Sequence, residues 1–268
     1  MGWWATMSDP EPFDSSVQPG VAGAADAVPS PALAGAASAL FGDRLPIAVA
    51  YAEALITDGV LRGLIGPREA PRIWERHLLN CAVISELISP AAIVVDVGSG
   101  AGLPGIVLSV ARPDLSVILL EPLARRTAFL SEVVAALNLD RTTVVRARAE
   151  EVGRGRGAPR IPPADVVTAR AVAPLDRLTA WCLPLVAVGG RLLALKGDSV
   201  TAEVAEHRAV IGQLGGGTPT VRRCGVGVLD DPTTVVEIVR ERAVDAGRTP
   251  GARPAARSRS SARRHPRG

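Results

Sequence analysis

Two patterns of apolar residues divide the chain into two parts. Between Leu45 and Leu87 the apolar positions recur with the period of a helix, and a second helix is predicted from about Ala70 to Leu87. From Ile93 onward the apolar residues form short uninterrupted runs, as in strands that are buried on both faces of a parallel sheet. We therefore predict a helical cap over residues 44–90 and an α/β domain over residues 91–243.

Strands and helices are predicted to alternate in the α/β domain. The expected strands are Ile93–Val97, Val117–Glu121, Thr143–Arg146, Val166–Thr168, Arg191–Leu195, Thr220–Val226 and Val235–Arg240, and the expected helices lie around Pro104–Ala111, Arg125–Leu137 and Leu175–Val186. No helix is predicted between the last two strands, so they should form a hairpin. A seven-stranded, mostly parallel sheet with a C-terminal β-hairpin is the Rossmann-like α/β fold of class I methyltransferases. Dinucleotide-binding dehydrogenases usually continue with another helical crossover instead.

The two ends of the chain differ in composition from the part between them. Residues 1–43 are rich in Pro, Ala, Gly and Ser without a sustained period, which predicts a disordered extension. Residues 244–268 are predicted to form a basic disordered tail, because seven arginines and no acid follow from residue 248 on. The formal net charge of +3 reflects this tail, and the remaining chain is mildly acidic. Binding of nucleic acid therefore requires a local basic patch or the tail.

Cysteine usage and the lack of long apolar runs suggest a cytoplasmic protein. Cys81, Cys182 and Cys224 lie far apart, form no CxxC pair and are odd in number, so we expect reduced thiols. No uninterrupted apolar run reaches the roughly 18 residues that a membrane span needs. The N-terminus also lacks the basic and apolar regions of a secretion signal. We expect neither secretion nor insertion into a membrane.

The strongest chemical signal is a glycine-rich turn that follows the first predicted strand. Asp96-Val97-Gly98-Ser99-Gly100-Ala101-Gly102-Leu103-Pro104-Gly105 places four glycines between a buried strand and a helix. Glycine lets the backbone approach a ligand closely, and a helix N-terminus offers free N–H groups to it. The spacing Gly98-x-Gly100-x-Gly102 suits S-adenosylmethionine. A tight turn without a ligand is the simplest alternative.

A dinucleotide site is the second alternative for this turn. Gly100-x-Gly102-x-x-Gly105 matches the GxGxxG pattern of NAD-binding proteins, which is a weak signal alone. Counted from the end of the strand, however, the match that starts at Gly98 would need a glycine where Leu103 stands. An NAD-linked oxidoreductase therefore stays open as an alternative function.

Two further corners of the predicted domain carry acidic residues. Glu121 ends the second strand about 20 residues after the turn, where an acid accepts hydrogen bonds from both ribose hydroxyls. A solvated carboxylate at a strand end is the alternative. After the third strand, Ala149 and Glu150 stand where methyltransferases hold the adenine ring with a backbone N–H and an adjacent acid. Glu150 could equally be a helix-start acid that complements the helix dipole.

Taken together, several motifs resemble one protein family, the small-subunit ribosomal RNA methyltransferase G family, also called GidB. The resemblance covers roughly Leu45 to Arg240, and its most specific parts are the LPG extension of the turn and the LKG end of the fifth strand. It rests on Arg76-His77-Leu78-Leu79-Asn80, the turn from Asp96 to Gly105, Arg125-Arg126-x-x-Phe129-Leu130, Arg148-Ala149-Glu150-Glu151, Ala169-Arg170-Ala171 and Ala194-Leu195-Lys196-Gly197. The sequence departs from the family at Asn80, where many members have Asp, and from Gly153 to Pro159, which looks inserted.

The resemblance implies an S-adenosylmethionine-dependent enzyme that methylates N7 of one guanine in the decoding-region loop of 16S ribosomal RNA. Its implied partner is 16S RNA or the 30S subunit, and we expect a monomer that uses no metal. The catalytic residues are unknown, with Arg76, His77, Arg148 and Lys196 as candidates. Carried over by motif, and with Glu121 added, the cofactor-binding residues are Gly98, Leu103, Glu121, Ala149, Glu150 and Arg170, and the RNA-binding residues are Arg125 and Arg126.

Guanine N7 carries a lone pair and no proton that must leave, so the site needs no general base. His77 could be a structural histidine of the cap or could act at the guanine. Tyr51 and Phe129 are aromatic candidates for stacking on a base, although core positions are the more usual reading. Two other functions stay open: a noncatalytic RNA-binding protein that kept the fold, and a methyltransferase that acts on a small molecule or a protein.

Overall fold

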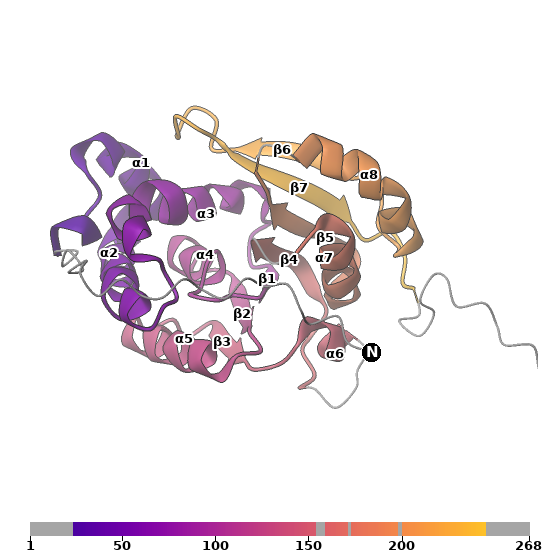
Figure 1. Cartoon of the computed structure of the whole chain (residues 1–268), viewed down its shortest axis with the longest axis horizontal. Coiled ribbons are helices and arrows are strands. Elements are labelled where there is room, and N and C mark those ends of the chain that lie inside the picture. The colour runs from indigo at the N-terminus through magenta and orange to yellow at the C-terminus, as the bar shows by residue number, and fades with distance from the viewer. Residues whose placement is uncertain (1–23, 154–158, 171–172, 198–199, 245–268) are drawn as a thin grey trace, which may run out of the picture.

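One sheet of seven strands forms the centre of the protein in the computed structural model (Figure 1). The structure describes residues 24–153, 159–170, 173–197 and 200–244. The strand order is β3-β2-β1-β4-β5-β7-β6, with β7 antiparallel to β5 and β6 and all other neighbours parallel. The predicted fold class, a mostly parallel sheet that closes with a hairpin, is confirmed. The strands are β1 Ile93–Val97, β2 Ser116–Leu120, β3 Thr142–Val145, β4 Ala164–Arg170, β5 Val186–Leu195, β6 Thr220–Cys224 and β7 Thr233–Val239.

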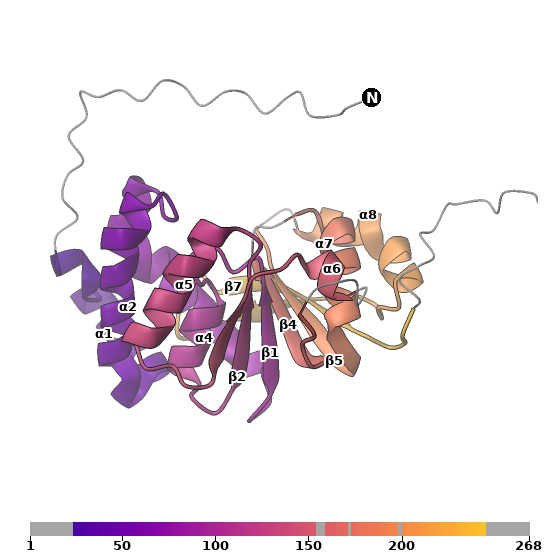
Figure 2. The ribbon, with the colours of Figure 1, turned by 90° about the horizontal axis from the view of Figure 1, so that it is seen from below.

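Helices cover both faces of this sheet (Figure 2). The N-terminal helices, α4 and α5 lie on one face, and α6, α7 and α8 lie on the other. The α-helices are α1 Pro31–Phe41, α2 Leu45–Ala54, α3 Asn80–Ala82, α4 Gly105–Ala111, α5 Ala124–Ala136, α6 Ala149–Gly153, α7 Leu175–Cys182 and α8 Val200–Gln213. Short 3-10 or π segments are η1 Ala24–Ala27, η2 Gly42–Arg44, η3 Leu55–Gly59, η4 Pro67–Arg72, η5 Trp74–Leu79, η6 Val83–Leu87 and η7 Leu183–Leu185.

The uninterrupted apolar runs of the central strands follow from burial on both sides. Val94 of β1 packs into the hydrophobic cluster beneath α4 and the N-terminal helices. Its neighbour Val95 packs into a second cluster with α7 on the opposite face. Successive side chains of a strand point to opposite faces, so both positions must be apolar when both faces are covered. The sheet therefore separates two cores and leaves its strand ends free for chemistry.

The N-terminal region is ordered over more of the chain than the composition predicts. The predicted disorder of residues 1–43 is wrong for residues 24–43, where η1, α1 and η2 form. The indole N–H of Trp74 donates to the Ala27 carbonyl at 2.8 Å, and the Trp74 ring meets Phe41 edge to face. The alanine-rich helix α1 buries only Ala37 and Phe41, so its hydrophobic period was too weak to read. Residues 1–23 and the predicted tail from 245 on lie outside the described residues, as do residues 154–158 of the apparent insertion.

One stretch of consecutive helices passes a length and composition test for a membrane span. Pro31–Gly59 is 29 residues long with a mean hydropathy of 1.2 in its most apolar window, whereas the prediction from uninterrupted apolar runs found no such segment. Core helices of soluble proteins pass the same test. In this fold the segment is tied to the α/β domain, because Arg44 Nε donates to the Val110 carbonyl and Tyr51 Oη to the Ala101 carbonyl, both at 2.8 Å.

Other predicted elements differ from the structure in their bounds. The predicted helix from Ala70 to Leu87 begins earlier and is built from the consecutive segments η4, η5, α3 and η6. The predicted helix Leu175–Val186 ends at Cys182, and Pro184 then lies in the 3-10 turn η7. Helix α8 was not predicted, because only Val200 and Ile211 among its described side chains are buried and no apolar stripe marks it. The carboxyl ends of β1 to β5 nevertheless lie within two residues of the predicted ends, so the predicted motifs lie along one edge of the sheet.

Candidate active site

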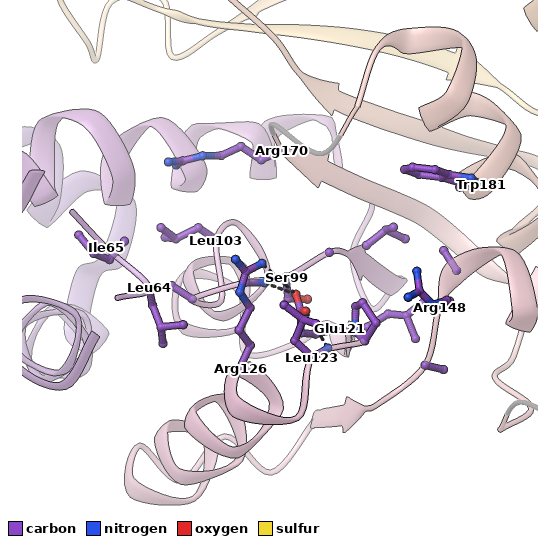
Figure 3. A pocket seen from close by; sticks show the side chains of 18 of the residues that line it. Leu64, Ile65, Ser99, Leu103, Glu121, Leu123, Arg126, Arg148, Arg170 and Trp181 are labelled. Carbon is purple, nitrogen blue, oxygen red and sulfur yellow. Dashed lines mark hydrogen bonds and ion pairs between the residues drawn. The ribbon is translucent and has the colours of Figure 1, made fainter. Parts of the chain in front are cut away.

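A cavity of about 720 Å³ opens at the carboxyl ends of β1, β2, β3 and β4. In open α/β sheets this edge is the usual place for a ligand. The wall is made by the turn after β1, the segments after β2 and β3, the end of β4, part of α7 and the loop before η4 (Figure 3). The lining residues are Leu64, Ile65, Gly66, Glu69, His77, Val97, Gly98, Ser99, Gly100, Ala101, Leu103, Leu120, Glu121, Pro122, Leu123, Arg126, Ala147, Arg148, Ala149, Glu150, Arg170, Arg177 and Trp181.

Asp96 holds the glycine turn from the inside. Its side chain is fully buried, and Oδ2 accepts a hydrogen bond from the Gly105 amide at 3.0 Å while Oδ1 accepts one from Thr168 Oγ1 at 3.0 Å. Burial raises the pKa of Asp96 to about 6, although the hydrogen bonds from Gly105, Thr168 and Ser99 oppose that rise. The aspartate thus fastens the turn to the start of α4 and to β4, and does not reach the cavity lining.

The glycines of the turn have two different reasons to be glycine. Gly98 and Gly100 have φ values of 68° and 59° and line the cavity. Gly102 has φ 103°, and a Cβ there would lie 2.5 Å from Ile106 Cδ1 and 2.8 Å from the Tyr51 hydroxyl oxygen. The first two permit close approach of a ligand, while Gly102 is required by packing beneath the turn.

The aromatic candidates of the sequence, Tyr51 and Phe129, belong to the core. Tyr51 is 1% exposed, its hydroxyl donates to the Ala101 carbonyl, and burial raises its pKa well above the ordinary value. Phe129 is also buried, with the Arg62 guanidinium 5.7 Å from its ring. Trp181 of α7 is the aromatic residue that lines the cavity. The core reading of Tyr51 and Phe129 therefore holds.

Glu121 joins the second strand to the glycine turn. Oε2 accepts a hydrogen bond from the Gly100 amide and Oε1 accepts one from the Leu123 amide, each at 3.0 Å. Each oxygen keeps a second lone pair that a ligand hydroxyl could use. Figure 3 shows the carboxylate at the cavity wall, so the structure places Glu121 where a ribose acceptor is expected.

Arg126 projects from α5 toward the same carboxylate. Its Nη1 lies 3.8 Å from Glu121 Oε2, and its side chain stands between Leu64 and Glu121 in Figure 3. Its Nε is buried and finds no hydrogen-bond partner within the described residues. An unpaired buried donor costs free energy, and this one lies in a side chain that lines the cavity. The residues present therefore fit a polar ligand that supplies an acceptor.

The segment after β3 forms the far end of the cavity. Ala149 begins α6, Glu150 follows it, and both line the wall. Arg148 is exposed, with Nη1 4.0 Å from Glu150 Oε1. Helix α7 contributes Arg177 and Trp181, whose guanidinium carbon and ring centroid are 5.2 Å apart. This end combines a free helix start, an acid and an aromatic ring, which together suit a planar heterocycle.

A chain of three polar side chains closes the opposite side. His77 Nε2 lies 3.0 Å from Glu69 Oε2, and His77 Nδ1 is contacted by Arg170 Nη2. Arg170 Nη1 also lies 3.4 Å from Cys81 Sγ. Burial, followed by the positive charge of Arg170, lowers the pKa of His77 to about 4, against the opposing effect of Glu69. His77 is thus neutral near pH 7, with both ring nitrogens engaged.

Three predicted site residues lie outside the cavity lining. Arg76 is half exposed and pairs with Glu69 at 3.3 Å. Arg125 is exposed on the first turn of α5. Lys196 Nζ donates to the Ala173 carbonyl at 3.1 Å and to Glu203 Oε1 at 2.8 Å, which ties the end of β5 to α8.

The other predicted residues are brought together, and several residues were missed. Gly98, Leu103, Glu121, Ala149, Glu150, Arg170, His77, Arg148 and Arg126 all line the cavity. Sequence reasoning did not identify Glu69, Arg177 or Trp181. Arg177 and Trp181 share one helix face by their i,i+4 spacing, which was the available signal. Within the described ranges, no cluster of His, Cys, Asp and Glu could hold a metal ion.

The strand order, the glycine turn after β1 and the acid after β2 define a class I S-adenosylmethionine-dependent methyltransferase. The sequence profile of the family described as rRNA small subunit methyltransferase G (GidB) matches residues 44–227. The chain therefore belongs to the rRNA small subunit methyltransferase G family, as the sequence motifs indicated.

Curated relatives carry the same family name. The protein named ribosomal RNA small subunit methyltransferase G in Salinispora tropica is 64% identical over 243 residues, which cover 90% of this chain and 99% of that protein. The protein of that name in Thermobifida fusca is 55% identical over 212 residues, covering 79% of this chain and 87% of that one. That of Corynebacterium efficiens is 53% identical over 207 residues, covering 77% and 88%.

Proposed function

We propose that this protein transfers a methyl group from S-adenosylmethionine to N7 of a guanine in 16S ribosomal RNA. One observation carries the proposal: in a member of this family, the expected cofactor corners, Arg170 among them, and three further arginine side chains line the same cavity. The arginines are Arg126, Arg148 and Arg177. A site that binds only a small acceptor would have little use for several guanidinium groups beside the cofactor position.

The residues proposed to hold the cofactor come from four strand ends. Gly98 and Leu103 supply the turn, and Glu121 supplies acceptors for ribose hydroxyls. Ala149 and Glu150 begin α6 and offer a backbone N–H and an acid to the adenine ring. Arg170 at the end of β4 completes the set. When bound, the cofactor supplies an electrophilic methyl group on a sulfonium.

The acceptor chemistry needs positioning and no base. Guanine N7 presents an in-plane lone pair, so no proton has to be removed when the methyl is transferred. His77, which lines the cavity, is held between Glu69 and Arg170 and is not free to act as a base. Holding two reacting atoms about 3–3.5 Å apart can lower a barrier by roughly 7–11 kcal/mol. The work of this site is to orient the guanine and exclude water.

RNA recognition is assigned to the arginines around the cavity. Arg148 and Arg177 are exposed and Arg126 is partly exposed, so their guanidinium groups can reach phosphates, with Arg125 beside them on α5. Bases turned out of RNA structure stack on aromatic or arginine planes, and the exposed guanidinium groups of Arg148 and Arg177 can serve this role. We expect binding to weaken with salt because phosphate contacts release counterions. The expected setting is a cytoplasmic monomer that acts on 16S RNA or the 30S subunit.

The decisive experiment measures transfer of labelled methyl from S-adenosylmethionine to 30S subunits from a strain that lacks the enzyme. Digestion and nucleoside analysis should identify 7-methylguanosine at a single site in 16S RNA. Naked 16S RNA in parallel shows which substrate form is used. Transfer to another nucleoside would overturn the N7 assignment. Binding of the cofactor without any transfer to RNA would point to a different acceptor, and tighter binding of NAD would overturn the cofactor.

A separate experiment tests whether Arg126 and Arg148 bind RNA. Arg126→Ala and Arg148→Ala should each lower transfer to RNA by raising the RNA concentration needed for half-maximal rate. Arg208→Ala on α8 is the matched control, because Arg208 is exposed and lies outside the cavity lining. If both cavity variants methylate RNA as well as the wild type, these arginines do not bind it.

A further inference from the structure

The Arg170 guanidinium lines the cavity, and no carboxylate of the described residues pairs with it. Its described hydrogen bonds go to the imidazole of His77 and the thiol of Cys81, both of them neutral groups. Among the ion pairs formed by the described residues, none involves Arg170. The positive charge of Arg170 lowers the pKa of the buried Asp96, but the Asp96 carboxylate accepts its hydrogen bonds from Gly105 and Thr168. A half-buried cation of this kind favours an anionic ligand.

His77 fixes how this guanidinium points. Every N–H of an arginine is a donor, so His77 Nδ1 must accept and the ring proton must sit on Nε2. Nε2–H then donates to Glu69, at 3.0 Å. Glu69 therefore selects the tautomer that leaves Nδ1 free to accept from Arg170. The chain runs from η4 of the cap, through η5, to the end of β4.

Burial, together with the positive charges of Arg170 and Arg76, keeps His77 neutral, while Glu69 opposes them. Glu69 of η4, Arg76 of η5 and Arg170 of β4 face the His77 ring. Tyr51 and Cys81 are buried beside Arg170, and burial raises the pKa of each above its ordinary value. A protonated imidazole would turn an N–H toward the guanidinium and break the contact. The arrangement thus holds Arg170 only while His77 is neutral.

We propose that Glu69 and His77 are positioning residues that aim Arg170 at the carboxylate of the cofactor's methionine moiety. The inference rests on the proposed function and assigns roles to two residues of the cap. The carboxylate is the anionic group of S-adenosylmethionine, whereas its sulfonium is cationic and would be repelled by Arg170. An RNA phosphate is the competing anion. Arg170 lies at the end of β4 beside β1 and its glycine turn, which favours the cofactor.

The test compares two ligands that differ in the amino-acid part. S-adenosylhomocysteine carries the carboxylate, and 5′-methylthioadenosine keeps the adenosine and the thioether but has no amino-acid group. Isothermal titration measures the dissociation constant of each with the full-length protein, without any turnover. If Arg170 contacts the carboxylate, a variant that disturbs the hydrogen bonds joining Glu69, His77 and Arg170 should bind S-adenosylhomocysteine more weakly. Its affinity for 5′-methylthioadenosine should stay unchanged.

Two substitutions of His77 separate its two hydrogen bonds. His77→Asn places an amide oxygen near the position of Nδ1 and can still accept from Arg170. His77→Gln places its amide near Nε2 and serves Glu69 alone. We expect His77→Gln to raise the dissociation constant of S-adenosylhomocysteine by about tenfold or more, as for loss of a hydrogen bond to a charged group. His77→Asn should stay within about threefold of the wild type, and His207→Asn on α8 is the control for a histidine elsewhere.

A third variant keeps the proposal testable if the variants of the buried His77 do not fold. Glu69 is partly exposed, so Glu69→Ala should fold, and it should weaken S-adenosylhomocysteine several-fold while 5′-methylthioadenosine binds as before. Equal weakening of both ligands in any variant would mean a purely structural role and overturn the proposal. So would unchanged S-adenosylhomocysteine binding with weakened RNA binding, which would make phosphate the anion. A wild-type protein that binds neither ligand would instead overturn the proposed function.

Discussion

One carboxylate oxygen of Glu121 accepts a hydrogen bond from the Gly100 amide at 3.0 Å, so the acid after β2 and the glycine turn after β1 are fastened to each other. The other oxygen accepts from the Leu123 amide at the same distance. Glu121 is proposed to bind the ribose, and it thus also fixes the glycine turn that forms another wall of the same site.

Glu121→Ala should therefore affect stability and binding together. Two partly buried amides lose their acceptor, and an unpaired buried donor costs about 1–3 kcal/mol. We expect the free energy of unfolding to fall by about 2 kcal/mol and the affinity for S-adenosylhomocysteine to fall by more than tenfold. Urea unfolding and calorimetric titration measure the two effects. Glu241→Ala, at an exposed carboxylate outside the cavity, is the control, and a Glu121 variant with unchanged affinity would remove this residue from the site.

Gly102→Ala should destabilise the protein, and Gly212→Ala should not. A Cβ at Gly102 would meet Ile106 and the Tyr51 hydroxyl at under 3 Å, with φ in the left-handed region. We expect a loss of about 2–3 kcal/mol. Gly212 lies in α8 with open space around its Cβ position, so alanine there should raise stability by about 0.5–1 kcal/mol. Thermal or urea unfolding distinguishes the two, and equal stabilities would contradict the packing under the turn.

The stability conferred by His77 should depend on pH. Its pKa falls from 6.5 in the unfolded chain to about 4 in the folded protein, so the unfolded state binds more protons between those values. The stabilisation is then present above pH 6.5 and is lost as the pH falls toward 4, by about 3 kcal/mol in all. The raised pKa of Asp96 acts in the opposite direction, and both proteins share it. The difference in unfolding free energy between wild type and His77→Asn should fall across this window, and a constant difference would contradict the low pKa.

Trp181 should report on the ligand. It lines the same end of the cavity as Ala149 and Glu150, so an adenine ring held there lies near its indole and changes its fluorescence. Trp74 is buried in the cap and hydrogen-bonded to Ala27. The change on adding S-adenosylhomocysteine should disappear in Trp181→Phe and persist in Trp74→Phe. The reverse pattern would place the adenine elsewhere.

The contributions of Lys196 and Glu203 to stability should be coupled through their ion pair. Their side chains are 15% and 20% exposed and 2.8 Å apart, and Glu203 also accepts from the Leu175 amide at 2.7 Å. A double-mutant cycle with Lys196→Met and Glu203→Gln should give a coupling of about 1–2 kcal/mol in unfolding free energy, more than a surface pair. Methyl transfer, measured well below the unfolding temperature, decides between this structural role and catalysis. A loss of kcat in Lys196→Met without loss of stability would favour catalysis.

The parts of the site that depend on local sequence could be predicted, and those that depend on packing could not. The turn from Gly98 to Leu103 and the acid at Glu121 stand next to strand ends, so pattern alone placed them on one sheet edge. Arg170 and His77 were named from motifs, but nothing in the sequence showed that they touch across 93 positions of the chain. Glu69 enters the site in the same way, through the docking of the cap.

The fold shows the same division. The central strands were predicted because burial on two faces leaves an uninterrupted apolar run. Helices α1 and α8 were missed because each buries few side chains, and a helix that rests on its neighbours by a narrow strip leaves little periodic signal. Prediction failed where the apolar and polar faces of a helix are poorly separated, because α1 is apolar on almost every side and α8 carries polar residues on most sides.

The hydrogen bond from the Tyr51 hydroxyl to the Ala101 carbonyl joins α2 to the loop that forms the cofactor cavity. Detachment of α2 and loosening of that loop are therefore linked equilibria. A ligand that orders the loop must hold the helix in place by the same free energy, and amide hydrogens of α2 far from the ligand should exchange more slowly when it is bound. Helix α2 is in this sense a thermodynamic part of the cavity that it does not line.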